Sequence, residues 1–284
     1  DVFFFCGSIP FEAARMGFTT IGSDLNPVAA FLSWAAINIV GGEPAVAIEI
    51  RKFQDELISS IEQQIAEWEI EHDEKGRRAE VFLYCSEVTC PDCGWRIPLA
   101  PSWVVSEKYQ TAAVLTANET EKRFDVSIVS NLSAAQLKDA KKSGTFQDSK
   151  LVCPNEKCPA HITPVSLNRL RGDRRSNGET EYGLRLWKNS DVVPRQDDVF
   201  GEKLYCIRWV DTVKENGKTK TIRSYETPNA ADLVREEKVV ALLQERLEKK
   251  KKKGYIPGRR IEPGDKTDEP IRTRGWTHWH HLFN

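Results

Sequence analysis

The sequence predicts an α/β fold that combines a layer of short strands and helices with a β-rich insertion and long helices. Three observations lead to this prediction. Residues 1–29 have the pattern of strand, turn, helix and strand. Residues 79–130 contain several short alternating runs separated by turn residues, which is typical of β-structure. Four cysteines form two spaced pairs at Cys90/Cys93 and Cys153/Cys158, which indicates a metal-binding insertion.

The beginning of the chain has the pattern of a cofactor-binding unit. A strand and a tight turn at Cys6-Gly7-Ser8 precede a short helix expected from Pro10 to Met16. A second expected strand, Phe18 to Ser23, delivers Asp24 at its carboxyl end. In such a unit the N–H groups of the turn face the ligand, and the acid accepts hydrogen bonds from ribose hydroxyls. We therefore predict half of a Rossmann-like site for an adenosine-bearing cofactor.

The motifs of this segment resemble those of the zinc-ribbon-containing adenine-specific DNA methylases of bacteria and archaea. The likeness rests on D-x-F at the start, G-S-I-P-x-E-A from Gly7 and S-D-L-N-P-V-A from Ser23. The dinucleotide fingerprint G-x-G-x-x-G is missing after the first strand, which disfavours an NAD-dependent enzyme. The resemblance implies an α/β fold: a partial Rossmann-like methyltransferase domain with an inserted β-rich zinc-ribbon domain and long helices.

The same resemblance implies S-adenosylmethionine as cofactor and methyl transfer to adenine N6 in DNA. The cofactor-binding residues that it implies are Asp1, Phe3, Gly7, Ser8, Ile9, Asp24, Leu25 and Asn26. Asp1 and the loop that follows would lie near the methionine end of the cofactor. Asp24 would bind the ribose, and the two residues after it would lie beside the adenine.

The segment also departs from the family pattern, D-P-F-x-G-G-G-S-I-P-x-E-A. Val2 stands in place of a proline, and Phe5 and Cys6 stand in place of glycines. Glycine permits positive φ and a close approach of the backbone to a ligand, whereas phenylalanine permits neither cheaply. Three alternatives stay open: a remodelled loop, weakened cofactor binding, and an ordinary α/β unit with Asp24 as an exposed loop acid.

The two cysteine pairs, C-P-D-C-G and C-P-N-E-K-C, have the spacing of metal-binding loops. Four thiolates are the ligand set of a closed structural zinc site, so we predict Zn²⁺ at Cys90, Cys93, Cys153 and Cys158. The interval between the pairs is long for a ribbon and predicts a β insertion. His161 could substitute for a thiolate, but four cysteines suffice without it. The alternative is a set of reduced core cysteines, which is how Cys6, Cys85 and Cys206 are interpreted.

Four parts are expected along the chain: residues 1–43 as the partial S-adenosylmethionine-binding half, 44–78 as a connecting helix, 79–228 as the β-rich zinc-ribbon insertion, and 229–284 as a helix, a basic segment and a return towards the core. The long helices are predicted as a buried one over Pro27 to Val40, an amphipathic one over Pro44 to Ile70, and one over Asn229 to Lys253. The last has Asn229 as its cap, an inner stripe that includes Leu233, Val240, Leu243 and Leu247, and a stop at Gly254. A hairpin is predicted around Asn216-Gly217.

Charge and composition limit the partners. Charged residues make up 29% of the sequence and the formal net charge is −1, so affinity for nucleic acid would come from local patches. Arg246 to Arg260 carries eight basic residues and one acidic residue and could bind a phosphate backbone, or be a solvated helix end. No apolar run approaches the ~20 residues that span a membrane, and no signal peptide is visible. The cysteine pattern fits a reducing cytosol, so a cytoplasmic protein is expected.

In the resembled family the chemistry depends on an Asp/Asn-Pro-Pro-Tyr loop, and this sequence contains no Pro-Pro pair. The chain is therefore expected to be an internal piece of a longer protein that holds the cofactor and zinc halves, no catalytic residue, and no activity alone. DNA is the implied partner, with a restriction or phage-defence protein as a further one. The alternative is a non-catalytic zinc-ribbon nucleic-acid-binding protein with a decayed cofactor site. His278, His280 and His281 are not assigned as ligands.

Overall fold

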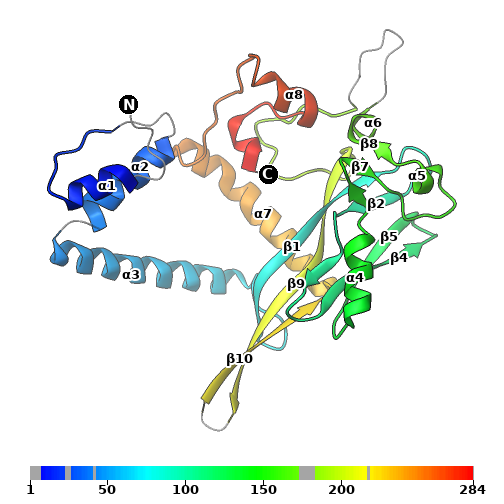
Figure 1. Ribbon diagram of the computed structural model, residues 1–284, viewed down its shortest axis with the longest axis horizontal. Helices are drawn as coiled ribbons and strands as arrows, with labels where there is room; N and C mark the ends of the chain where they lie inside the picture. The colour runs from blue at the N-terminus through cyan, green and yellow to red at the C-terminus, as the bar shows by residue number, and fades with distance from the viewer. Residues whose placement is uncertain (1–7, 23–26, 41–42, 173–182, 216–217, 284) are drawn as a thin grey trace. The chain divides into compact units, whose positions relative to one another are not determined.

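The computed structural model describes residues 8–22, 27–40, 43–172, 183–215 and 218–283 (Figure 1). Contacts divide the chain into two compact units, Asp1–Trp68 and Glu69–Asn284. Helices and strands both occur, which confirms a mixed α/β protein at that level. None of the helices in the described part of the chain is long and apolar enough to cross a membrane.

The regular elements that the structure describes in the first unit are all helices. They are α1 (Ser8–Arg15), α2 (Pro27–Ala35), a π-helix (Ala36–Val40) and α3 (Pro44–Trp68). The three predicted helices of this part are all found, with shifted ends. Pro44 is the first residue of α3, a position where its missing N–H costs no hydrogen bond. Glu69 has a φ of 52°, and this left-handed conformation ends α3 two residues before the predicted boundary.

Two predictions for the first unit are wrong. Residues 18–22, predicted as a strand, form no regular element, and Ile21 is 99% exposed. A strand needs a neighbour for its backbone N–H and C=O groups, and the described residues of this unit offer no other strand. The predicted buried helix from Pro27 is also exposed: Phe31 is 62% and Trp34 53% accessible, whereas Ser33 is buried.

The second unit contains a sheet of seven strands among the described residues. The strands are β1 (Arg78–Thr89), β2 (Arg96–Leu99), β3 (Val104–Ser106), β4 (Thr111–Asn118), β5 (Arg123–Val129), β9 (Phe200–Glu215) and β10 (Lys218–Glu226). Their order is β10-β9-β1-β2-β5-β4-β3. Neighbouring strands are antiparallel except β2 and β5, which pair in parallel. Glu215 pairs with Lys218, which confirms the predicted hairpin, although Asn216 and Gly217 themselves lie outside the described residues.

A second, small sheet and several helices complete this unit. The small sheet has β6 (Phe146–Gln147), β7 (Lys150–Leu151) and β8 (Val165–Ser166), in that order. The helices are α4 (Ala134–Lys142), α5 (Pro159–Ile162), α6 (Leu167–Arg171), α7 (Ala230–Lys252), α8 (Asp268–Arg274) and a 3-10 helix (Trp279–Phe283). In Figure 1 the small sheet lies beside β2, at one end of the long β1–β9 pair.

The largest hydrophobic cluster joins the two sheets of this unit. Val88 of β1 and Ile97 of β2 pack in one cluster with Leu151 of β7, and all three are almost fully buried. Trp95 and Phe124 meet at a ring-centroid distance of 5.3 Å in the same cluster. Because burial of apolar surface is the main favourable term in folding, this cluster fixes the two sheets against each other.

Helix α7 begins where the sequence predicts. Asn229 accepts a hydrogen bond from the backbone N–H of Asp232 at 3.0 Å, and Asp232 accepts one from the backbone N–H of Asn229 at 2.8 Å. This reciprocal capping box satisfies two backbone donors at the helix start. The helix ends at Lys252, just before Gly254 with its φ of 74°. The predicted inner stripe is only partly right, since Leu247 is buried but Leu233 is 45% exposed.

Replacing Asn229 with alanine is expected to lower the free energy of unfolding by about 1 kcal/mol, because the backbone N–H of Asp232 loses its side-chain acceptor, whereas the bond from the backbone N–H of residue 229 to Asp232 can remain. Urea unfolding followed by circular dichroism measures the change. The matched control is Asn229→Ser, since serine caps helices nearly as well as asparagine. An alanine variant as stable as the serine variant would contradict the prediction.

Candidate metal centre

The four paired cysteines lie together in the second unit. Their Sγ atoms are all within 4.8 Å of one another. The Sγ–Sγ distance is 3.7 Å between Cys90 and Cys158 and 3.8 Å between Cys93 and Cys153. A disulfide would need about 2.05 Å. Four sulfurs bound tetrahedrally to zinc at about 2.3 Å are separated by about 3.8 Å, so the cluster has the dimensions of a metal site.

The first loop folds into a tight turn directly after β1. The backbone N–H of Cys90 donates to the carbonyl of Trp95 at 2.8 Å, and the N–H of Gly94 donates back to the carbonyl of Cys90 at 2.8 Å. Gly94 has a φ of 73°, which a side chain would disfavour. The backbone N–H groups of Asp92 and Cys93 then point at the Cys90 sulfur and donate to it. The glycine therefore allows the tight turn that closes the first loop.

The second loop follows β7 and has the same design. Cys153 donates its backbone N–H to the carbonyl of Ala160 at 3.1 Å, and Cys158 donates to the carbonyl of Asn155 at 2.9 Å. In return, the backbone N–H of Asn155 donates to the sulfur of Cys153, and that of Ala160 donates to the sulfur of Cys158. N–H groups aimed at sulfur stabilise thiolates, which are the ligand form of cysteine.

Protonation of the cluster is uneven. A hydrogen bond from the Cys153 thiol, helped by backbone N–H groups, lowers the pKa of Cys90 to about 5. That same hydrogen bond and burial raise the pKa of Cys153, and burial raises the pKa of Cys158 to about 11. Thiolates this close together repel one another, so the four sulfurs do not all ionise readily by themselves. A divalent cation removes this conflict, because it stabilises thiolates that lie within 4.8 Å of each other.

The surroundings hold the loops in place. Cys90, Cys153 and Cys158 belong to the buried cluster that joins the two sheets. His161 donates from Nδ1 to the carbonyl of Cys153 at 2.8 Å, so it fastens the second loop and is not one of the clustered ligands. Asp92, between the first two cysteines, forms an ion pair with Arg169 of α6. Nothing in the sequence pattern had singled out this pair.

The remaining cysteines of the described chain are core residues. Cys206 of β9 is fully buried and Cys85 of β1 is 8% exposed, and neither belongs to the cluster. Burial raises the pKa of each thiol to about 12, which makes both poor nucleophiles. Their interpretation as core residues is confirmed. Cys6 lies outside the described residues.

The predicted cofactor residues are mostly outside the described part of the chain. These are Asp1, Phe3, Gly7, Asp24, Leu25 and Asn26. Ser8 is the first residue of α1, two residues before the expected helix start, and Ile9 is 60% exposed. Ile9 also lines a hollow of about 260 Å³ between α1 and residues 19–22. The end of that segment leads directly into the stretch that holds Asp24.

The basic segment from Arg246 to Arg260 divides into two kinds of side chain. Four lysines at the end of α7 and after it are exposed: Lys249, Lys250, Lys252 and Lys253. Lys251 instead turns inward and bonds to the backbone carbonyl of Asn189. Arg259 pairs with Glu262 at 2.8 Å, and Tyr255 is 72% exposed. The exposed lysines keep their charge available to a partner.

No protein-family model, no curated protein and no solved structure matches this chain. Its function must therefore be inferred from the motifs and from the geometry of the site. The strongest geometric feature is the cluster of four cysteines, which could hold a metal ion.

Proposed function

We propose that this chain is the cofactor- and zinc-bearing part of an S-adenosylmethionine-dependent DNA methyltransferase that acts on adenine N6. The four-cysteine cluster carries the metal part of the proposal. The methylase-like motifs at Gly7 and Ser23 carry the cofactor part. The proposed arrangement is a partial Rossmann-like domain with an inserted zinc ribbon.

Three properties favour zinc at the cysteine cluster. The ligands are four sulfurs, their spacing fits a tetrahedral ion, and backbone N–H groups support them. Four protein ligands leave no open position for water or substrate. The ion would therefore be structural and would stabilise the β-rich unit.

The cofactor part rests on the chemistry of the sequence motifs. A carboxylate at the end of the second expected strand of such a unit can accept hydrogen bonds from the ribose hydroxyls of the cofactor. Asp24 is the acid at this position, in the motif S-D-L-N-P-V-A. The reaction would move a methyl group from the sulfonium sulfur of the cofactor to the adenine amine, which loses a proton. Because the sequence has no Asp/Asn-Pro-Pro-Tyr loop, this chain alone would bind the cofactor without turnover.

Titration calorimetry with S-adenosylmethionine tests the cofactor part. We expect the chain to bind it and Asp24→Ala to weaken binding at least tenfold, because the ribose would lose its acceptor. Asp55→Ala, which removes an acid from the exposed surface of α3, is the matched control and should bind as the unchanged chain does. NAD is titrated in parallel, and binding of NAD instead would contradict the proposal.

The runner-up is a non-catalytic zinc-ribbon protein that binds nucleic acid. The exposed lysines at the end of α7 favour it, because they could neutralise phosphates without any cofactor. Phe5 and Cys6 in the cofactor loop favour it as well. A chain that contains zinc but binds neither S-adenosylmethionine nor NAD would exclude the first function and leave this one.

A further inference from the structure

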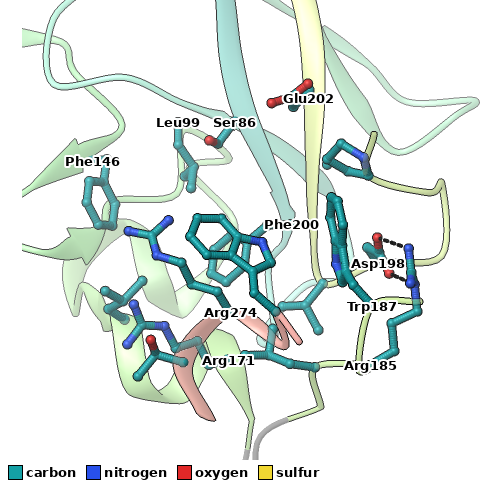
Figure 2. A pocket seen from close by; sticks show the side chains of 17 residues that line it. Ser86, Leu99, Phe146, Arg171, Arg185, Trp187, Asp198, Phe200, Glu202 and Arg274 are labelled. Atoms are coloured by element: carbon teal, nitrogen blue, oxygen red, sulfur yellow. Dashed lines mark hydrogen bonds and ion pairs between the residues drawn. The ribbon is translucent and has the colours of Figure 1, made fainter. Parts of the chain in front are cut away.

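A pocket of about 390 Å³ lies in the second unit, and none of the four clustered cysteines is among its lining residues (Figure 2). Strands β1, β2 and β9, helices α6 and α8, and residues 184–199 all contribute to its lining. Segments far apart in the sequence therefore build one cavity. Its volume falls in the range of about 300 to 1,000 Å³ that is typical of small-molecule sites.

Aromatic rings form much of the pocket lining. Phe146, Trp187, Phe200 and Trp276 all contribute. Trp187 is 8% exposed, so its position is fixed by the surrounding packing. Flat rings of this kind offer stacking faces to a planar ligand, and stacking on them tolerates different bases.

The pocket is also lined by arginines, and these differ in whether an acid neutralises them. Arg185 is neutralised within the fold: Asp198 accepts two hydrogen bonds from it, at 2.5 and 3.0 Å, and Asp191 accepts a third. Arg274 is different, because it lies over the Trp276 ring at 5.0 Å and forms no ion pair with any acid that the structure describes. In the view of Figure 2, the guanidinium groups of Arg171 and Arg274 lie on the side of Phe146, and the Arg185–Asp198 pair lies on the opposite side.

We propose that this pocket binds a nucleotide, with its base stacked on the aromatic rings and its phosphate held by Arg274. An apolar ligand would leave the charge of Arg274 unused, and an inorganic anion would leave the aromatic rings unused. A nucleotide uses both, because arginine binds phosphate through its forked donors and the rings stack on the base. The proposal rests on the nucleic-acid part of the proposed function and names where one nucleotide of the strand would lie.

The nucleotide has two sources, a DNA strand and the free nucleotide, and the test separates them. Anisotropy of a fluorescein-labelled single-stranded oligodeoxyadenylate measures strand binding to the full chain, with unlabelled dAMP as competitor. Titration calorimetry measures dAMP binding directly. Arg274→Gln is expected to weaken strand binding about tenfold and to reduce the salt slope by about one, since one phosphate contact is lost. Arg272→Gln is the matched control, because Arg272 lies on the same helix and outside the pocket. Both side chains are exposed, so neither change threatens folding.

Each outcome decides the matter. Weaker strand binding by Arg274→Gln, with unchanged binding by Arg272→Gln, supports the proposed nucleotide site. Competition by dAMP then shows whether a free nucleotide also enters the pocket. If dAMP binds in an Arg274-dependent way but the strand does not bind, the pocket stands and the nucleic-acid part of the proposed function falls. Equal losses in both variants, no loss in either, or no binding of either probe would overturn the inference. Cofactor affinity is measured separately, so failure of the methyltransferase proposal is distinguishable.

Discussion

Replacing Cys153 with serine is expected to abolish stoichiometric metal binding and to lower the free energy of unfolding by about 4 kcal/mol or more. Cys153 is fully buried, and its sulfur lies 3.8 Å from that of Cys93. A serine hydroxyl is a poor zinc ligand, and three thiolates would be left close together in the core. Zinc content by mass spectrometry and urea unfolding by circular dichroism measure the two effects.

The matched control is Cys206→Ser, which removes another fully buried thiol outside the cluster. This variant is expected to lose some stability but to keep one equivalent of zinc. Chelation of the unchanged chain should reproduce the instability of Cys153→Ser and should barely affect Cys153→Ser itself. A chain purified without metal, or a Cys153→Ser variant with full zinc content, would contradict the metal assignment.

The cysteine cluster was predictable from sequence because its information is local. Each loop carries two thiols at a fixed spacing, and Gly94 supplies the left-handed turn that the first loop needs. The same is true of α7, whose cap and end depend on Asn229 and Gly254. Short-range hydrogen bonds and backbone preferences decide these features, so they leave a signature within a few residues.

The errors concern features that depend on distant partners. Residues 18–22 have a strand-like composition, but the described part of their unit provides nothing for them to pair with. Phe31 and Trp34 look like core residues in sequence and are exposed here. Strand pairing and burial are properties of the whole fold, and hydrophobic pattern alone cannot supply them.

The pocket proposed to bind a nucleotide could not be predicted from the sequence for a related reason. Its residues come from β1 and β2, from α6, and from segments beyond residue 184, so no single stretch carries the pattern. The network of Arg185 with Asp191 and Asp198 was missed as well, although Asp191 and Asp198 follow closely in sequence. Trp276, which lines the pocket, lies two residues before His278, in a stretch that the sequence left without an assigned site.

Acid is expected to destabilise the second unit through His281. This side chain is fully buried and donates from Nε2 to the carbonyl of Lys188 at 2.9 Å. Its Nδ1 accepts from the backbone N–H groups of Thr277 at 3.2 Å and His278 at 3.3 Å, so a proton on Nδ1 would face two donors. Burial, reinforced by the neighbouring His280, lowers the pKa of His281 from 6.5 to about 4.

The sign of the effect follows from linkage. Because the folded pKa of His281 lies below the unfolded value, the unfolded chain binds more protons between about pH 6.5 and pH 4. The free energy of unfolding is therefore highest above this window and falls by about 3 kcal/mol as the pH drops through it. Burial also lowers the pKa values of His278 and His280, which acts in the same direction.

Urea unfolding at several pH values between 7.5 and 4.5, on the unchanged chain and on His281→Gln, measures this contribution. Glutamine can still donate to the Lys188 carbonyl but does not titrate, so the variant should be less stable at pH 7.5 and lose less stability on acidification. His72→Gln, which removes a histidine outside this cluster, should keep the full pH dependence. Release of zinc by acid affects all three proteins alike and cancels in the comparison. Parallel stability curves for the unchanged chain and His281→Gln would show that His281 titrates as freely in the folded protein as in the unfolded one, against the contacts that surround it.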